Sequence, residues 1–280
     1  MATDEAYKPR PFLKWAGGKG QLLPELTAAV AEARKFKAYH EPFVGGGALF
    51  FALQGGGALA EKSVRLSDTN PRLIDLYLAI RDDVSGVIRH LKKHAAAHDE
   101  TYYYATRAEI PKTSSARAAR LLYLNRTCFN GLFRENSKGE FNVPMGRYKN
   151  PAICDEPKLR AASAALAQAD IACRPFESVL DHAAKGDFVY FDPPYAPVSA
   201  TAQFTSYHQD GFGTADQERL ADVCAQLHRR KVKFLLSNSD VPLIRDLYKD
   251  FQVSQVFATR MVNSRADRRG KVAEVLVRNF

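Results

Sequence analysis

A short apolar run that stops at two prolines constrains this chain most. The run Phe188–Phe191 follows a Lys185-Gly186-Asp187 turn, and four β-prone residues in that setting predict a buried strand. The strand must end at Asp192, because Pro193 and Pro194 cannot donate hydrogen bonds to a neighbouring strand. Asp192, the prolines and Tyr195 therefore lie at the carboxyl end of a strand, where open α/β sheets bind ligands.

The string Asp192-Pro193-Pro194-Tyr195 suits the activation of an amino group on a heteroaromatic ring. The lone pair of such an amine is delocalised, and two acceptors that hold both N–H bonds can turn it toward an electrophile. Asp192 offers a carboxylate oxygen, and Pro193 offers a carbonyl on a backbone of fixed φ. Tyr195 offers a flat face for stacking. This arrangement favours group transfer by positioning, and a stiff turn after a strand is the alternative explanation.

Short apolar runs alternate with helical segments along most of the chain, which predicts an α/β fold. The segment from 71 to 127 is mostly helical by pattern. The expected strands are 38–44, 64–67, 171–174, 188–191, 232–237, 252–257 and 273–278, and the expected helices are 21–36, 48–54, 84–97, 157–169, 215–230 and 241–251.

A glycine turn after the first expected strand indicates a nucleoside cofactor. Gly45-Gly46-Gly47 joins that strand to a helix, a geometry that brings backbone close to a ligand. Asp68 follows Gly45 by 23 residues, a spacing at which an acid takes a ribose hydroxyl. Capping of the next helix is the alternative role of Asp68. Phe50, at the sixth position from Gly45, excludes the Gly-x-Gly-x-x-Gly pattern of nicotinamide enzymes.

The charge distribution favours a polyanionic partner. The 280 residues carry a net charge of +9, and seven Lys/Arg face two acids between residues 114 and 149. A turn at 136–139 in this region predicts a β-hairpin over 129–144. Its basic, amide and apolar side chains suit base reading in duplex DNA, and a solvated basic hairpin is the alternative. A second basic loop spans 263–271.

Two further classes of protein are not expected. No apolar run approaches the roughly 18 residues of a membrane span, and the N-terminus lacks a signal-peptide pattern. We therefore expect a cytoplasmic protein without a membrane partner. His90, His94 and His98 share one face of a helix but span about 12 Å, too far for one metal ion. We expect no metal and a solvated face.

Several of these segments together resemble the Dam-type DNA adenine-N6 methyltransferases, the alpha-class D12 family. The resemblance is carried by Phe12–Lys19, Glu41–Gly47 with Asp68, Asn130–Lys149 and Asp192–Tyr195. It implies a class I methyltransferase-like Rossmann sheet with an inserted, mainly helical target-recognition module that carries a β-hairpin. Residues 1–70 and 151–280 would form the S-adenosylmethionine-binding catalytic domain, and residues 71–150 the DNA target-recognition domain.

The resemblance also implies the reaction and its residues. The methyl group of S-adenosylmethionine would go to adenine N6 in double-stranded DNA, usually at GATC, on a flipped base. The implied catalytic residues are Asp192, Pro193, Pro194 and Tyr195. The implied cofactor contacts are Trp15, Lys19, Phe43, Gly45, Gly47, Asp68 and Asp192, and the implied DNA-reading positions are Lys14, Asn130, Leu132, Arg134, Pro144 and Tyr148.

Two alternatives stay open on the sequence. An amino methyltransferase acting on RNA or on a protein glutamine would favour Asn before the prolines and would not need the hairpin. A catalytically inactive DNA-binding relative would not need an intact Asp192–Tyr195 string. The sequence does not decide whether a cognate restriction nuclease exists or whether the protein is a monomer. The loop 196–212 follows the candidate site directly, where it could close over substrate.

Overall fold

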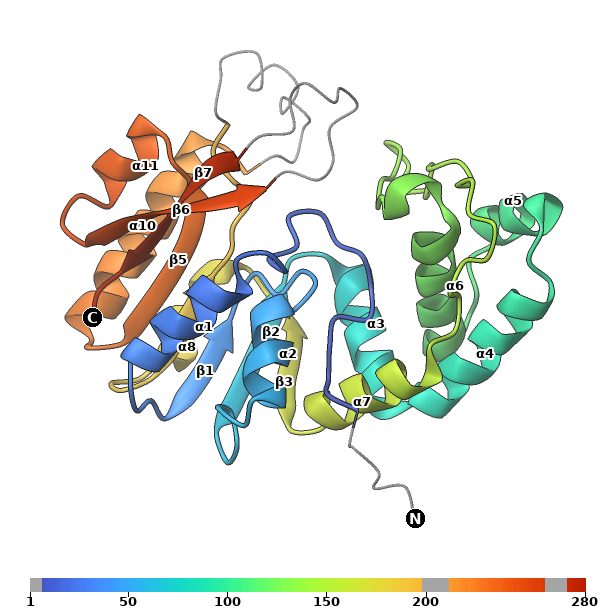
Figure 1. The fold of residues 1–280 in the computed structure, drawn as a ribbon, viewed down its shortest axis with the longest axis horizontal. Coiled ribbons are helices and arrows are strands. Elements are labelled where there is room, and N and C mark those ends of the chain that lie inside the picture. Colours follow the sequence, from blue (N-terminus) through green and yellow to red (C-terminus); the bar gives the residue numbers. More distant parts are fainter. Residues whose placement is uncertain (1–6, 198–211, 260–270) are drawn as a thin grey trace. The chain divides into compact units, whose positions relative to one another are not determined.

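The structure is a computed structural model, and it describes residues 7–197, 212–259 and 271–280. The greater part of the loop 196–212 and of the basic loop 263–271 lies outside the described residues. The chain divides into two compact units (Figure 1). The helical unit comprises residues 1–18, 45–60 and 70–173, and the sheet unit comprises residues 19–44, 61–69 and 174–280.

Seven strands form one sheet in the order β3-β2-β1-β4-β5-β7-β6. The strands are β1 (Ala38–Glu41), β2 (Ser63–Asp68), β3 (Ala169–Cys173), β4 (Phe188–Phe191), β5 (Lys233–Ser239), β6 (Gln252–Thr259) and β7 (Lys271–Arg278). Strand β1 pairs in parallel with β2 and β4, and β4 pairs in parallel with β5, whereas β7 runs antiparallel to β5 and β6. The predicted class I methyltransferase-like Rossmann sheet is confirmed.

The strand order reverses between β1 and β4, and such a switch point opens a crevice at the carboxyl ends of the strands. All four side chains of β4 are buried, as expected for a strand that is covered on both faces. Val189 and Phe191 join a core with helix α10 (Thr214–Arg229), which lies alongside β5 in Figure 1. On the other face, Phe188 stacks on Tyr39 of β1, with ring centroids 6.2 Å apart.

The remaining helices of the sheet unit are short. They are α1 (Leu23–Glu32), α8 (Val179–His182) and α11 (Pro242–Leu247). The helix expected over 241–251 ends at Leu247, because Tyr248 leaves the helical conformation with φ −114°. The side chain of Tyr248 is fully buried in the core that contains α10, so packing of the aromatic ring overrides the helical pattern of the sequence.

All the α-helices of the helical unit except α2 begin with a capping side chain. The helices are α2 (Ala48–Gly55), α3 (Pro71–Asp82), α4 (Val84–Ala96), α5 (Glu100–Ala108), α6 (Ser114–Thr127) and α7 (Glu156–Leu166). Asn70, Asp83, Asp99, Thr113 and Asp155 each accept a backbone N–H at the start of a helix. Asn70 caps α3, so the alternative role of Asp68 as the cap of this helix is wrong.

The expected hairpin forms with two isolated antiparallel bridges, Cys128–Met145 and Glu135–Phe141, rather than two regular strands. Its turn closes through Gly139 N–H, which donates to the Asn136 carbonyl at 2.9 Å. Arg72 of α3 donates to the Gly139 carbonyl and pairs with the Glu135 carboxylate. A side chain from α3 therefore holds the turn where strand pairing is sparse.

The expected solvated face is wrong for His94 of α4 and for His98, which lies two residues beyond the end of this helix. His94 stacks on Tyr123 of α6 at 4.8 Å, and His98 Nδ1 lies 2.9 Å from the Tyr123 hydroxyl. Burial, with His90 and Arg120 nearby, lowers the pKa of His94 to about 4. The neutral ring packs like an aromatic residue, which a count of polar residues on the helix face does not reveal.

Neither a metal-ligand cluster nor a membrane-spanning helix is found among the residues that the structure describes. No group of three His, Cys, Asp or Glu side chains among these residues could hold a metal ion. None of the helices in the same residues has both the length and the apolar character to cross a membrane.

Candidate active site

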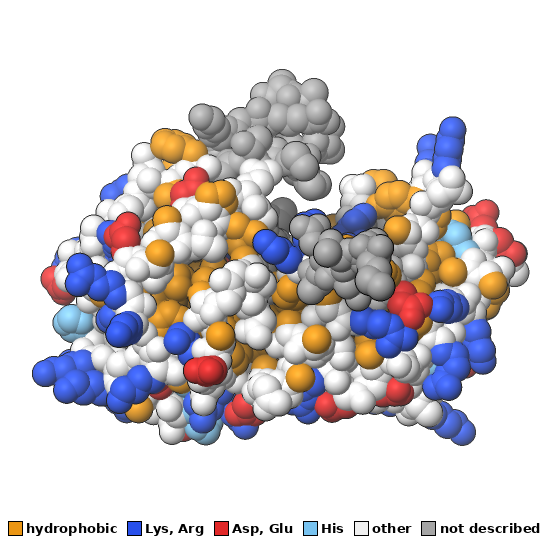
Figure 2. Space-filling view, turned by 60° about the horizontal axis from the view of Figure 1, so that its bottom comes forward, with side chains coloured by type: hydrophobic (Ala, Val, Ile, Leu, Met, Phe, Trp, Pro, Cys, Tyr) orange, Lys and Arg blue, Asp and Glu red, His pale blue; other side chains and the backbone are white. Residues whose placement is uncertain are grey.

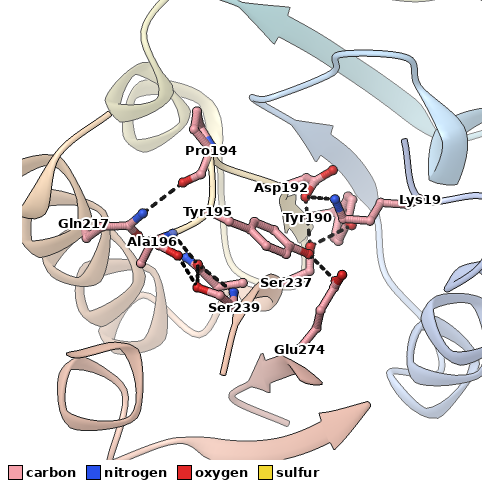
Figure 3. Close-up of polar contacts among 11 residues, drawn as sticks. Lys19, Tyr190, Asp192, Pro194, Tyr195, Ala196, Gln217, Ser237, Ser239 and Glu274 are labelled. Atoms are coloured by element: carbon pink, nitrogen blue, oxygen red, sulfur yellow. Dashed lines mark hydrogen bonds and ion pairs between the residues drawn. The ribbon is translucent and has the colours of Figure 1, made fainter. Parts of the chain in front are cut away.

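The carboxylate of Asp192 lies directly after β4 and is held by two donors. Lys19 Nζ lies 2.8 Å from Asp192 Oδ1. The hydroxyl of Ser237 on β5 donates to the same oxygen at 3.0 Å (Figure 3). Behind it, the buried Tyr190 hydroxyl lies 3.0 Å from Ser237 Oγ. The acid predicted from the sequence is thus fixed at the switch point of the sheet.

Burial sets the titration of this carboxyl group. Removal from water raises the pKa of Asp192 above its ordinary value, while the Lys19 ammonium and the Ser237 hydroxyl act in the opposite direction. Glu274 adds a further increase through like-charge repulsion. Desolvation outweighs the donors, so the pKa of Asp192 is raised overall. Lys19 limits that rise and favours the ionised acceptor.

Tyr195 is fixed at its hydroxyl as well as at its backbone. The phenol donates to Glu274 Oε2 of β7 at 2.6 Å. Burial, Asp192 and Glu274 all raise the pKa of Tyr195, so the phenol stays protonated and keeps its proton for Glu274. Lys19 Nζ lies 4.5 Å from the centre of the Tyr195 ring. The ammonium group of Lys19 therefore contacts both the carboxylate of Asp192 and the face of Tyr195.

A chain of buried polar side chains, which we call the amide clamp, fixes the backbone around Tyr195. It consists of Gln217 on α10 with Asn238 and Ser239 on β5, each at most 2% exposed. Gln217 Nε2 donates to the Pro194 carbonyl at 2.9 Å, and Asn238 Nδ2 donates to Gln217 Oε1 at 3.0 Å.

The clamp binds both the N–H and the carbonyl of Ala196. Asn238 Oδ1 accepts the Ala196 N–H at 3.0 Å, and Ser239 Oγ donates to the Ala196 carbonyl at 2.6 Å (Figure 3). The clamp, like Ser237 and Glu274, is absent from the sequence-based set of site residues. The signal for it was the polar run Ser237-Asn238-Ser239 at the end of an otherwise apolar strand.

The sheet unit also holds three of the predicted cofactor contacts, Lys19, Phe43 and Asp68. Phe43 stacks on Phe176 with ring centroids 5.4 Å apart, and Asp68 ends β2 with its backbone carbonyl accepting from Arg174 N–H at 3.2 Å. The sheet unit thus offers paired aromatic rings, the acid at the end of β2 and the acid after β4. Aromatic faces and carboxylates are groups that fit a cationic nucleoside. Phe176 was missed, although it follows β3 at the same edge of the sheet.

The other predicted cofactor contacts, Trp15, Gly45 and Gly47, belong to the helical unit. Gly45 and Gly47 have φ of 46° and 66°. A Cβ on Gly47 would lie 2.8 Å from the Tyr77 hydroxyl, which donates to the Gly45 carbonyl at 3.1 Å. The turn therefore requires glycine. The ring of Trp15 packs on Phe133, with centroids 5.2 Å apart.

The predicted DNA-reading residues also belong to the helical unit, and buried Asn125 organises two of the loops that carry them. Its amide exchanges two 2.8 Å hydrogen bonds with the Lys14 backbone and donates to the Gly131 carbonyl at 3.0 Å. Lys14 Nζ lies 4.9 Å from the centre of the Tyr148 ring. Asn130 adopts φ 55°, a conformation that Asn tolerates better than most residues. Lys14, Asn130 and Tyr148 are thus brought together.

The remaining predicted DNA contacts have side chains that water can reach. Leu132, Arg134 and Pro144 are all exposed. The guanidinium of Arg134 is oriented by Asn142, whose Oδ1 accepts from Nε at 2.7 Å. The sequence-based set omits both Asn125 and Asn142. Their roles follow from contacts between segments, which spacing along the chain does not show.

Comparisons with a family model and with known proteins indicate the same family. The family model described as D12 class N6 adenine-specific DNA methyltransferase matches residues 15–262. The type II methyltransferase M1.LlaDCHI of Lactococcus lactis subsp. cremoris is 43% identical over 97% of this chain and 95% of its own length. The type II methyltransferase M.MjaIII of Methanocaldococcus jannaschii is 41% identical over 97% and 99%. The DNA adenine methylase of Haemophilus influenzae is 37% identical over 96% and 93%.

Solved structures are more distant. The rRNA methyltransferase aviRa from Streptomyces viridochromogenes matches with a TM-score of 0.39 and 15% identity, over 95% of this chain and 89% of its own. A likeness at that level does not bear on the substrate.

Asn238→Leu tests the amide clamp. The change removes the acceptor for Ala196 N–H and the donor for Gln217 Oε1, and each buried group left without a partner costs about 1–3 kcal/mol. We expect the free energy of unfolding in urea to fall by about 2–5 kcal/mol. Asn150→Leu, at an exposed position, is the control and should change it by less than about 0.5 kcal/mol. Equal small losses in both variants would contradict a clamp.

Proposed function

Because the chain belongs to the D12 class N6 adenine-specific DNA methyltransferases, we propose that it acts at GATC, on an adenine flipped out of the duplex. The family makes the protein an adenine-specific DNA methyltransferase and implies S-adenosylmethionine as the methyl donor. The RNA and protein-glutamine alternatives are therefore not retained. The sequence GATC and the flipped base are what we add.

The position of the Lys19 ammonium carries the proposal for the flipped base. Lys19 Nζ lies 2.8 Å from Asp192 Oδ1 and 4.5 Å from the centre of the Tyr195 ring. An exocyclic amine of an adenine stacked on Tyr195 would present an N–H donor in the same surroundings. Stacking on a ring requires a free base face, and a base inside a duplex has both faces covered. Flipping exposes the face and costs a few kcal/mol.

Asp192 and the Pro193 carbonyl would hold the two N6 hydrogens, so that the nitrogen lone pair is directed away from the ring. Lys19 would then give up its place on the carboxylate. We assign Asp192 the role of an acceptor that orients the amine rather than of a general base, because a carboxylate is a weak base even where burial raises its pKa. The amide clamp and Glu274 keep Pro194 and Tyr195 in place during the reaction.

Residues of the sheet unit fit the implied donor. Phe43 and Phe176 would pack against its base, and Asp68 would take its ribose. S-adenosylmethionine supplies the electrophilic methyl group when it is bound.

The exposed side chains of the hairpin segment suit the guanine and the thymine of GATC. Arg134 suits the O6 and N7 acceptors of guanine, and Leu132 and Pro144 suit the methyl group of thymine. Asn142 holds the Arg134 guanidinium with a 2.7 Å hydrogen bond, which lowers the entropy lost when it meets a base.

Methylation of plasmid DNA tests the proposed function. The wild-type protein, incubated with plasmid and S-adenosylmethionine, should make the DNA resistant to nucleases that cut unmethylated GATC. Asp192→Ala should abolish protection while leaving DNA binding largely intact, because the carboxylate touches the reacting amine rather than the phosphates. Asp222→Ala, at an exposed position of α10, should protect like wild type. Methylated adenine at sites other than GATC would refute the proposed sequence, and normal turnover of Asp192→Ala would refute the role of the carboxylate.

Lys19→Met tests the electrostatics of the acceptor. Methyl transfer needs ionised Asp192, so kcat/KM falls as the pH drops through the pKa of this group. Lys19 lowers that pKa, and its removal should move the acidic limb of the pH–rate profile to higher pH. The profile should be measured at saturating donor, with Lys93→Met as the control. An unchanged limb would mean that the ammonium does not stabilise the charged carboxylate in the free enzyme.

Arg134→Ala tests base reading. We expect the preference for GATC over duplexes changed at one particular base pair to fall by about 1–3 kcal/mol in kcat/KM, the usual value of one bidentate contact. Lys149→Ala, at an exposed position near the hairpin, should instead weaken all sequences alike and reduce the salt dependence. A sequence preference that survives Arg134→Ala intact would exclude this arginine from base recognition.

A further inference from the structure

The sheet unit carries a second concentration of positive charge at the edge opposite Asp192. Four segments at the amino ends of β1, β2, β4 and β5 form this region, which we call the basic edge: residues 33–37, 61–62, 184–187 and 228–233. They contain nine Lys/Arg against two acids, Glu61 and Asp187. The cations are Arg34, Lys35, Lys37, Lys62, Lys185, Arg229, Arg230, Lys231 and Lys233. Asp187 is buried, with Oδ2 3.1 Å from His40 Nε2, which leaves Glu61 as the exposed acid of these segments.

Hydrogen bonds join three of the four segments, and a cation–π contact connects the fourth, residues 61–62, to them. Lys37 N–H donates to the Gly186 carbonyl at 3.0 Å, and Gly186 N–H donates to the Lys231 carbonyl at 3.2 Å. Lys233 Nζ donates to the Ala33 carbonyl. Lys62 Nζ lies 5.2 Å from the centre of the Phe36 ring. The charges are therefore carried on backbone that the sheet fixes, rather than on independent loops.

Most of these side chains are directed to water. Arg34, Lys35, Lys37, Lys185, Arg229, Arg230 and Lys231 are exposed. In the view of Figure 2, Lys and Arg side chains gather along the lower left margin of the molecule, with few acidic side chains between them. Among the residues that the structure describes, none of these seven side chains forms an ion pair.

Two of the cations stand where the backbone favours glycine. Arg34 and Lys231 have φ of 58° and 59°, just after the ends of α1 and α10. Glycine is the preferred residue there, because a side chain is strained in the left-handed region. Glu61, the exposed acid of the same edge, has a φ of 58° as well, so this backbone conformation alone does not account for the cations.

A cation after a helix also interacts favourably with the helix dipole. That interaction can account for Arg34 and Lys231. It does not account for Lys37, which directly precedes β1 and lies beyond the last turn of α1, where the dipole effect has faded. The charge extends along the whole edge, across four neighbouring strands, so an extended anionic partner explains it better.

We propose that the basic edge is a second, sequence-independent binding surface for duplex DNA. Four adjacent strands at about 4.8 Å spacing span roughly 14 Å, which is comparable to the ~12 Å width of the major groove and lets cations reach phosphates on both of its sides. Asp192 lies at the carboxyl ends of the same strands, so DNA at the basic edge is a different segment from the one that supplies the adenine. Such a surface holds the enzyme on DNA between target sites.

A capture experiment tests the second surface. Immobilised duplex with one GATC is saturated with the protein, and a labelled duplex made only of G·C pairs is added over a series of salt concentrations. We expect wild type to retain the second duplex. Lys37→Gln/Lys231→Gln should bind it about 30-fold more weakly at 0.15 M salt, because each lost phosphate contact removes a slope of about 0.9 in log K against log [salt]. The control Lys93→Gln/Lys249→Gln removes the same charge elsewhere.

Several results would overturn the proposal. The second duplex could bind the Lys37→Gln/Lys231→Gln variant as tightly as wild type, or the control could lose as much. Vesicles of anionic lipid or an acidic peptide could also displace the labelled duplex at concentrations where unlabelled duplex does not, which would assign the surface to another partner.

The proposal rests on the DNA substrate of the family and not on GATC. Capture is read without turnover, so failure of methylation at GATC leaves this readout intact.

Lys231→Gly separates a DNA role from a structural one. Glycine relieves the left-handed backbone, and we expect the Tm to rise by about 2 °C while capture of the second duplex falls. A lower Tm with capture at the wild-type level would make the lysine a partner of the helix dipole and would overturn its role in binding.

Discussion

The hydrogen-bonded carboxylate of Asp192 is the interaction on which the rest of the site depends. A carboxylate at the end of a buried strand is costly unless donors replace the water it loses. Lys19 and Ser237 supply those donors to the same carboxylate oxygen, at 2.8 Å and 3.0 Å. The arrangement keeps the acceptor charged and aimed, and it leaves a place that an aromatic amine can take from the ammonium.

The residues packed behind this carboxylate restrict the conformations of Pro194, Tyr195 and Ala196. The amide clamp fixes the peptides on both sides of Tyr195, and Glu274 fixes its hydroxyl. Each member of the clamp is buried and hydrogen-bonded, so movement of the loop would leave polar groups unpaired in a dry core. The sheet thereby converts a short sequence string into a rigid binding surface, and positioning of this kind accounts for much of enzymatic rate enhancement.

The sequence predicted what depends on local chemistry. The run at 188–191, the two prolines after it and the glycine turn predicted the strand, its end and the approach of backbone, and β4 has the bounds expected for it. The same reasoning failed where the outcome depends on contacts between distant segments. Asn125, Asn142 and the amide clamp act across 6 to 111 residues of separation. Packing against Tyr123 makes His94 partly buried, which its helical spacing did not indicate.

The most direct measurement is a structure of the protein with a GATC duplex and S-adenosylhomocysteine. We predict the target adenine outside the duplex, with N6 within hydrogen-bond distance of an Asp192 carboxylate oxygen and of the Pro193 carbonyl, its ring on Tyr195, and Lys19 displaced from the carboxylate. An adenine that remains stacked in the helix, or an extruded base with N6 far from Asp192 while Lys19 keeps its ion pair, would contradict the central role of this carboxylate.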